Sequence, residues 1–208
     1  ITPDAQRTFA GNLGASLSLE KSDVSCDAIQ NAKILHLTGY ELEDKKLREA
    51  SIHAFDIARA GGTKISVDLG DPSLVERCGE DLKNIVAQYA DFIFANREEA
   101  KIFTGLENPV EALGALSKNS KTAIVKIGSK GSLIESAGKL ISIEAYPAKV
   151  VDTTGAGDLF AAGFLWGCTQ SKPLETCGRL GSFLAGKVIS QVGPRVNFSA
   201  EEIQAIIQ

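Results

Sequence analysis

The residues best suited to chemistry lie in the segment 150–164, where the end of a predicted strand meets a turn of small residues and then a long apolar helix. The turn contains Gly155, Ala156 and Gly157. These residues have little or no side chain, so their backbone N–H groups can close around an anion. The helix that follows adds its positive N-terminal end. The segment therefore predicts an anion-binding turn.

Asp158 stands at the mouth of this turn. A carboxylate is repelled by a bound phosphate, and its position is explained if it accepts a proton from a hydroxyl that attacks that phosphate. The alternative is that Asp158 caps the N-terminus of the helix, which is a common role for aspartate. The spacing alone leaves both roles open.

The run Asp152-Thr-Thr-Gly-Ala-Gly-Asp158, followed by Phe160, Ala162 and Gly163, resembles the C-terminal signature of the ribokinase-like (PfkB) carbohydrate kinases. A lone GxG is a weak signal, whereas this run at the start of an apolar helix is specific. The resemblance implies transfer of a phosphoryl group from ATP to a hydroxymethyl group of a sugar or nucleoside. It also implies that Asp158 is the catalytic base and that the backbone of residues 155–158 forms the anion hole.

Asn96-Arg-Glu-Glu99 follows a predicted strand and matches the NxxE motif of the same family, which is associated with magnesium and phosphate. An amide and a carboxylate at a helix N-terminus can hold the water shell of Mg²⁺, which usually keeps several waters. The resemblance implies that Asn96 contacts the nucleotide and that Asn96 and Glu99 hold Mg²⁺ through water. The alternative for Glu99 is a structural interaction with the helix dipole.

Lys126-Ile-Gly-Ser-Lys-Gly131 matches the family's strand followed by GxxG. There Gly128 and Gly131 let a backbone turn lie against the ribose and phosphates of the nucleotide. Lys126 is counted among the nucleotide contacts, although many relatives carry a small polar residue at its position. The family builds its adenine slot between two later helices. The residues expected to contact the nucleotide there are Ala185, Val188, Ile189 and Val192.

Asp152 and Thr154 resemble positions that bind a monovalent cation such as K⁺ in several relatives. The segment Thr2–Thr8 resembles a strand of the adenosine-kinase-like branch, which favours a nucleoside substrate. The motifs of the family's substrate half and lid have no counterpart in this chain. Together with a start at Ile1 and the absence of Met, this predicts that the N-terminal part of a longer kinase is missing.

The elements that position these residues alternate between short apolar runs and longer helical patterns. Strands are predicted over 33–38, 64–68, 91–95 and 122–126. Helices are predicted over 42–60, 81–89, from 96, 111–118, 155–168, 174–191 and 200–207. Such alternation predicts an α/β fold with a mostly parallel central sheet and helices on both faces. The loops after the strands then lie along one edge, where α/β proteins bind ligands.

Two runs joined through Ala137-Gly138, within residues 131–143, predict a small antiparallel hairpin added to this sheet. The segment Asp4–Ala10 is a further candidate strand. The economical interpretation is a single α/β domain over residues 1–208. Trp166 and His36 fall within apolar elements and are expected in the core, His36 as a hydrogen-bonded core residue.

Composition excludes several classes of protein. With 22 Lys plus Arg against 26 Asp plus Glu, the net charge of −4 argues against a nucleic-acid binder. The longest apolar stretch, 159–168, is shorter than the ~20 residues of a membrane-spanning helix. The four cysteines are widely spaced, without a CxxC or a Cys/His zinc pattern. We expect reduced thiols, a cytoplasmic location and no membrane partner.

Two functions remain open at this level. The first is the ATP- and Mg²⁺-dependent kinase implied by the resemblance, acting on a sugar or nucleoside, with adenosine favoured. The second is a nucleotide-binding regulatory protein or inactive fragment, which the missing half favours and the retained Asp158 opposes. Many relatives dimerise through the lid, and a homodimer stays an alternative here.

Overall fold

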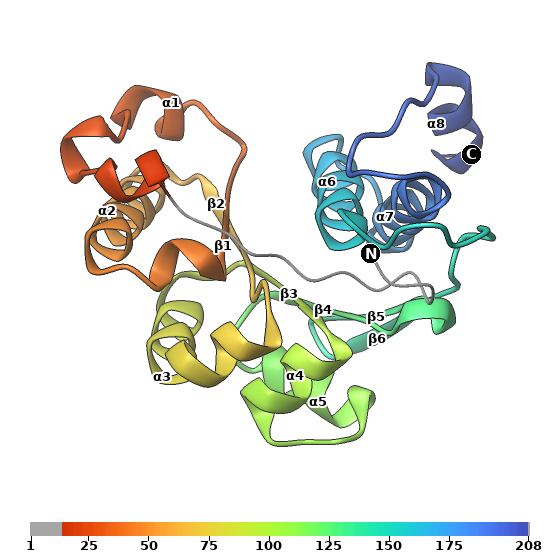
Figure 1. The fold of residues 1–208 in the computed structure, drawn as a ribbon, viewed down its shortest axis with the longest axis horizontal. Coiled ribbons are helices and arrows are strands. Elements are labelled where there is room, and N and C mark those ends of the chain that lie inside the picture. Colours follow the sequence, from red (N-terminus) through yellow and green to blue (C-terminus); the bar gives the residue numbers. More distant parts are fainter. Residues whose placement is uncertain (1–13, 208) are drawn as a thin grey trace. The chain divides into compact units, whose positions relative to one another are not determined.

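The computed structural model describes residues 14–207, which form two compact units (Figure 1). The N-terminal unit contains residues 14–125 and 135–140, and the C-terminal unit contains residues 126–134 and 141–207. The prediction of one domain stays a prediction. The nucleoside-branch segment Thr2–Thr8 and the candidate strand Asp4–Ala10 lie outside the described residues.

The strands form a six-stranded sheet in which they neighbour one another in chain order. They are β1 (Ile34–Thr38), β2 (Lys64–Asp68), β3 (Phe92–Asn96), β4 (Thr122–Lys126), β5 (Ser132–Ser136) and β6 (Lys139–Ile143). β1, β2 and β3 are parallel, and Ser66 of β2 pairs with His36 on one side and Phe92 on the other. This confirms the predicted α/β fold.

The predicted hairpin is also confirmed. Between β5 and β6 the two turn residues, Ala137 and Gly138, have φ values of +51° and +75°. Positive φ at both central residues is typical of the type I′ turn, which joins antiparallel strands because its twist matches theirs.

The N-terminal unit carries the short helices that precede β1 and the helices that connect β1 to β4. They are η1 (Gly14–Ser18), η2 (Lys21–Asp23), α1 (Cys26–Gln30), η3 (Gly39–Leu42), α2 (Lys45–Gly61), α3 (Pro72–Tyr89), α4 (Arg97–Thr104) and α5 (Pro109–Ser117). Right-handed crossovers between successive neighbours place α2, α3 and the α4–α5 pair on the same face of these strands. The core between them contains Phe55, Ile65, Leu74 and Phe94, all almost completely buried.

Two helix starts differ from the sequence prediction by three residues or more. α2 begins at Lys45 and not at Leu42, because the Asp44 carboxylate accepts hydrogen bonds from the N–H groups of Lys46 and Leu47. α3 begins at Pro72 and not at Asp81. Asp71 caps it in the same way, and proline at the first helical position fits because it has no N–H to satisfy.

The C-terminal unit consists of η4 (Gly128–Lys130), α6 (Ala156–Thr169), α7 (Leu174–Ile189) and α8 (Ala200–Ile207), with parts of the hairpin. α6 and α7 lie side by side (Figure 1). Their backbones touch at Gly163, where a Cβ would lie 2.7 Å from the Leu180 carbonyl oxygen. None of the helices in residues 14–207 has the length and apolar character needed to cross a bilayer.

Two residues expected in the core are exposed, so those predictions are wrong. Trp166 is 43% exposed because α6 buries its glycine-lined face against α7 and leaves the line of Asp158, Ala162 and Trp166 at the surface. His36 is exposed on β1, where its Nδ1 forms a 3.0 Å hydrogen bond with the Ser66 hydroxyl.

Candidate active site

The turn of small residues opens α6. Gly155 is the residue before the first helical turn and has φ +78°. A Cβ on Gly155 would lie 3.0 Å from the Pro194 Cβ and 3.1 Å from its Cα. Both the left-handed backbone and the closeness of Pro194 therefore require glycine here. The loop after α7 packs directly against the start of α6.

The start of α6 presents backbone N–H groups. The N–H of Ala156 donates to the Thr153 carbonyl at 3.3 Å. The next N–H groups, those of Gly157 and Asp158, have no acceptor one turn back within the helix, as at any helix N-terminus. With the positive end of the helix dipole at the same point, this turn is suited to an anion.

Lys126, at the end of β4, brings a positive charge to the turn. Its Nζ lies 3.2 Å from the position that a Cβ on Gly157 would occupy, and the side chain is half-buried. The Lys126 ammonium and the N-terminal end of α6 are both positive, so together they are suited to a phosphate group.

Asp158 is exposed in the first turn of α6. The helix is capped by Gly155, so the alternative that Asp158 is the N-cap residue is wrong. Within residues 14–207 its carboxylate takes part in no hydrogen bond or ion pair. A carboxylate in this position is able to accept a proton from a hydroxyl bound next to it.

Asp152 organises the loops around the turn. It is 1% exposed, and one carboxylate oxygen accepts hydrogen bonds from the Thr154 N–H at 2.9 Å and from the Thr154 hydroxyl at 2.6 Å. The other oxygen accepts a 2.9 Å hydrogen bond from the Gly193 N–H. The hydrogen bond from the Thr154 hydroxyl, followed by those from Gly193 and Thr154 N–H groups, lowers the pKa of Asp152 below its ordinary value.

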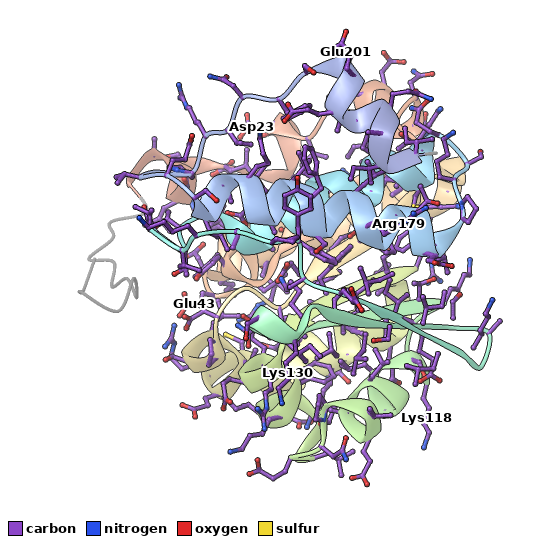
Figure 2. The ribbon with its side chains drawn as sticks, turned by 90° about the vertical axis from the view of Figure 1, so that its right-hand side faces the viewer. Asp23, Glu43, Lys118, Lys130, Arg179 and Glu201 are labelled. Carbon is purple, nitrogen blue, oxygen red and sulfur yellow. The ribbon has the colours of Figure 1, made fainter. Side chains whose placement is uncertain are left out.

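The GxxG segment forms a tight turn at the foot of the hairpin. Gly128 and Gly131 have φ of +64° and +88°, and a Cβ on Gly131 would lie only 1.9 Å from the Ile143 carbonyl oxygen. Gly131 is therefore required by the close approach of β6. Gly128 has open space around it. Lys130, labelled in Figure 2, is exposed on this turn.

The predicted adenine contacts on α7 and after it differ in accessibility. Val188 is completely buried, so it packs in the core and offers no surface to a ligand. Ala185 and Ile189 are half-buried, and Val192 is 73% exposed. Of the four, these three have side-chain surface available for a nucleotide.

Asn96 and Glu99 belong to the N-terminal unit, whereas all other predicted site residues belong to the C-terminal unit. Asn96 donates its backbone N–H and its amide to the two Glu99 oxygens at 2.6 and 2.5 Å, and the Glu99 N–H donates to Asn96 Oδ1 at 2.9 Å. This is a capping box at the start of α4. Glu99 is 2% exposed, and both of its oxygens are used.

The structural alternative for Glu99 therefore describes its observed contacts. Among residues 14–207, no group of three or more His, Cys, Asp or Glu side chains is arranged to hold a metal ion. A direct carboxylate–metal contact at Glu99 does not fit its burial, and the water-mediated role of Asn96 and Glu99 stays a prediction.

The sequence did not single out Pro194, whose backbone and side chain fix the conformation of Gly155. The Gly193-Pro194 pair in the loop after α7 was the available signal, since this pair marks a turn.

Comparison with known proteins supports one family. The sequence profile described as "pfkB family carbohydrate kinase" matches residues 1–201. A probable sugar kinase from Rhizobium etli CFN 42 has 35% identity and a TM-score of 0.88 over 92% of this chain. An adenosine kinase from Sinorhizobium meliloti has 35% identity and a TM-score of 0.87 over 91% of this chain. The 5-dehydro-2-deoxygluconokinase of Bacillus subtilis is 30% identical over 93% of this chain.

The chain spans 59% of each of these two solved chains and 62% of the B. subtilis protein. The profile match extends from residue 1 to the start of α8 and includes the Gly155–Asp158 turn, the GxxG segment and the capping box. The chain therefore belongs to the pfkB family of carbohydrate kinases.

Proposed function

We propose that this chain is the nucleotide-binding and catalytic part of an ATP-dependent kinase that phosphorylates a hydroxymethyl group of a sugar or nucleoside. The observation that carries the proposal is the juxtaposition at the start of α6. There an exposed Asp158 carboxylate follows a glycine turn that presents helix N–H groups, and the Lys126 ammonium lies against Gly157. These features supply a base and an anion-binding site within one helical turn.

Each residue has a distinct task in this proposal. Asp158 takes the proton from the attacking hydroxyl, which makes the oxygen a better nucleophile as the new O–P bond forms. The backbone N–H groups of residues 155–158 and the Lys126 ammonium stabilise the negative charge on the transferring phosphoryl group. Asp152 positions the turn through Thr154 and Gly193.

ATP supplies the phosphoryl group when bound, and the anion-binding turn fits its phosphates. The half-buried Ala185 and Ile189 and the exposed Val192 are suited to the adenine because they offer apolar surface in the same unit. The family resemblance implies that Gly128 lets the backbone turn approach the ribose and phosphates. Gly131 holds that turn against β6.

Two cations are part of the proposal. Mg²⁺ neutralises phosphate charge, and we assign it to Asn96 and Glu99 through water, because the Glu99 carboxylate is buried and bonded to Asn96. K⁺ is assigned to the Asp152–Thr154 loop. Carboxylate oxygens suit such a cation, although both Asp152 oxygens already accept hydrogen bonds from the protein.

Adenosine is the favoured substrate, supported by the 35% identity to the S. meliloti adenosine kinase. A free sugar or sugar acid is the alternative, supported by the sugar-kinase and 5-dehydro-2-deoxygluconokinase relatives. We also propose a cytoplasmic location without a membrane partner, and the net charge of −4 argues against a nucleic-acid partner. A homodimer is the proposed assembly if the family's lid accompanies this chain.

The test is an ADP-release assay with ATP, Mg²⁺ and a panel of adenosine, inosine, guanosine, ribose, fructose and 5-dehydro-2-deoxygluconate. We expect turnover with adenosine that is lost in Asp158→Asn. Turnover with a sugar alone would move the substrate from nucleoside to sugar. Binding of ATP without turnover on any member of the panel would favour the non-catalytic nucleotide-binding alternative.

A further inference from the structure

A pair of thiols lies at the far end of the α6–α7 hairpin from the anion-binding turn. The Sγ atoms of Cys168, in the last turn of α6, and of Cys177, in the first turn of α7, are 3.7 Å apart. At a rise of 1.5 Å per residue, about 15 Å of helix separates Cys168 from Asp158. The proposed kinase chemistry makes no use of this pair.

The two helix backbones touch beside these thiols. A Cβ on Gly167 would lie 2.9 Å from the Cys177 Sγ and 3.1 Å from the Cys177 Cα. No side chain therefore separates the helices at this level. A disulfide has an S–S length of about 2.05 Å, so the two sulfur atoms need to approach each other by roughly 1.7 Å. Side-chain rotation between two adjoining helices is able to supply such a movement.

The two thiols differ in their access to solvent. Cys177 is completely buried, and its Sγ also contacts the Lys172 carbonyl at 3.5 Å. The hydrogen bond with Cys168 and the burial of the thiol raise the pKa of Cys177. Cys168 is half-buried. A small oxidant in solution therefore reaches Cys168 first.

We propose that Cys168 and Cys177 form a reversible disulfide in response to peroxide. The Cys168 sulfur attacks one peroxide oxygen and the O–O bond breaks. Cys168 becomes a sulfenic acid, and the released hydroxide leaves as water with the thiol proton. The Cys177 sulfur then attacks the Cys168 sulfur. The S–O bond breaks, and the second hydroxide leaves as water with the Cys177 proton. Two thiols are oxidised and one peroxide is reduced to two waters.

Such a bond suits a protein whose cysteines are otherwise reduced. Within residues 14–207, none of the four cysteines is joined in a disulfide. Disulfides in reducing compartments are mostly transient and respond to oxidants. A pair of neighbouring cysteines with one accessible and one buried sulfur has the arrangement of an attacking and a resolving cysteine.

The test treats the full chain with hydrogen peroxide, alkylates the remaining thiols and digests the protein with trypsin. Trypsin does not cleave between Lys172 and Pro173, so the peptide 150–179 contains Cys168 and Cys177 and no other cysteine. We expect this peptide to lose two hydrogen atoms and to escape alkylation, and dithiothreitol to restore two alkylated cysteines. A peptide that stays doubly alkylated while the exposed Cys26 is oxidised would overturn the proposal.

Variants test the order of the two steps. In Cys177→Ala, dimedone should label Cys168, because no resolving thiol is left to consume the sulfenic acid. In Cys168→Ala, Cys177 should stay unlabelled. Cys78→Ala removes a buried cysteine of the other unit and should leave the 150–179 linkage unchanged. The Cys168–Cys177 linkage in the wild-type protein decides the proposal even if a variant at the buried site fails to fold. Labelling of Cys177 by dimedone in Cys168→Ala would contradict the order in which the two cysteines react.

Discussion

The carboxylate of Asp152 accepts a 2.9 Å hydrogen bond from the backbone N–H of Gly193, which lies 41 residues further along the chain. The same carboxylate holds Thr154, one residue before Gly155. One buried side chain thus joins the segment that leads into α6 to the loop that follows α7. The shape of the anion-binding turn depends on this charge, because backbone N–H groups bind an anionic acceptor more strongly than a neutral one.

Asp152→Asn should lower stability at neutral pH and reduce the pH dependence of unfolding. The pKa of Asp152 is lower in the folded protein than its ordinary value of 3.8. Its stabilising contribution is therefore fully present above that value and is lost as the pH falls through the folded-state pKa. Urea unfolding of wild type and variant at neutral and at acidic pH measures this. The two proteins should differ most at neutral pH, and a constant difference down to acid would contradict the assignment.

Asp158→Asn should reduce kcat by roughly 10²–10⁴ and leave the Kd for ATP nearly unchanged, because it removes a proton acceptor and no phosphate contact. The chain offers a matched control in Glu111→Gln. Glu111 is an exposed carboxylate in the first turn of α5, at the same position relative to its cap, Asn108, as Asp158 has relative to Gly155. The control should keep wild-type turnover. Turnover that survives in Asp158→Asn would exclude Asp158 as the base.

Much of the fold was predictable because short apolar runs were bounded by turn residues. β2 and β4 have the predicted bounds, and α6, α7 and α8 differ by at most two residues at an end. The start of α3 at Pro72 was missed because the helix was recognised by its apolar spacing and not by the Asp71-Pro72 start signal.

The site was predictable in its parts but not in their contacts. The sequence pattern identified Lys126 and Gly157 separately, and only the folded C-terminal unit, which holds both residues, shows that the Lys126 ammonium lies against Gly157. Likewise, the sequence left two roles open for Glu99, one in a metal site and one at the helix end. The structure shows that Glu99 is buried and forms a capping box with Asn96. Which face of α6 is buried is set by α7, and for this reason Trp166 was placed wrongly.

Lys126→Ala should weaken ATP binding by roughly 10- to 100-fold, since a hydrogen bond to a charged group contributes about 1.5–3 kcal/mol. Adenosine binding should change little, because the lost charge acts on the phosphates. Lys130→Ala is the control, because Lys130 is an exposed lysine on the adjoining turn. Calorimetric titration with ATP and with adenosine separates the two ligands. Equal weakening of both would show that Lys126 supports the fold and not the phosphate site.

Gly155→Ala should destabilise the protein more than Gly62→Ala, and the difference measures the contact with Pro194. The two glycines have nearly the same left-handed backbone, with φ of +78° and +75°. A side chain in that conformation costs roughly 1–2 kcal/mol at either position. Around Gly62 there is open space, whereas a Cβ on Gly155 meets the Pro194 Cβ at 3.0 Å and must displace the loop after α7. Thermal unfolding of the two variants gives the comparison.

Because the same loop carries Gly193, Gly155→Ala should also weaken phosphate binding at α6, whereas Gly62→Ala should not. Equal destabilisation, with ATP affinity unchanged in both variants, would show that Pro194 does not shape the turn.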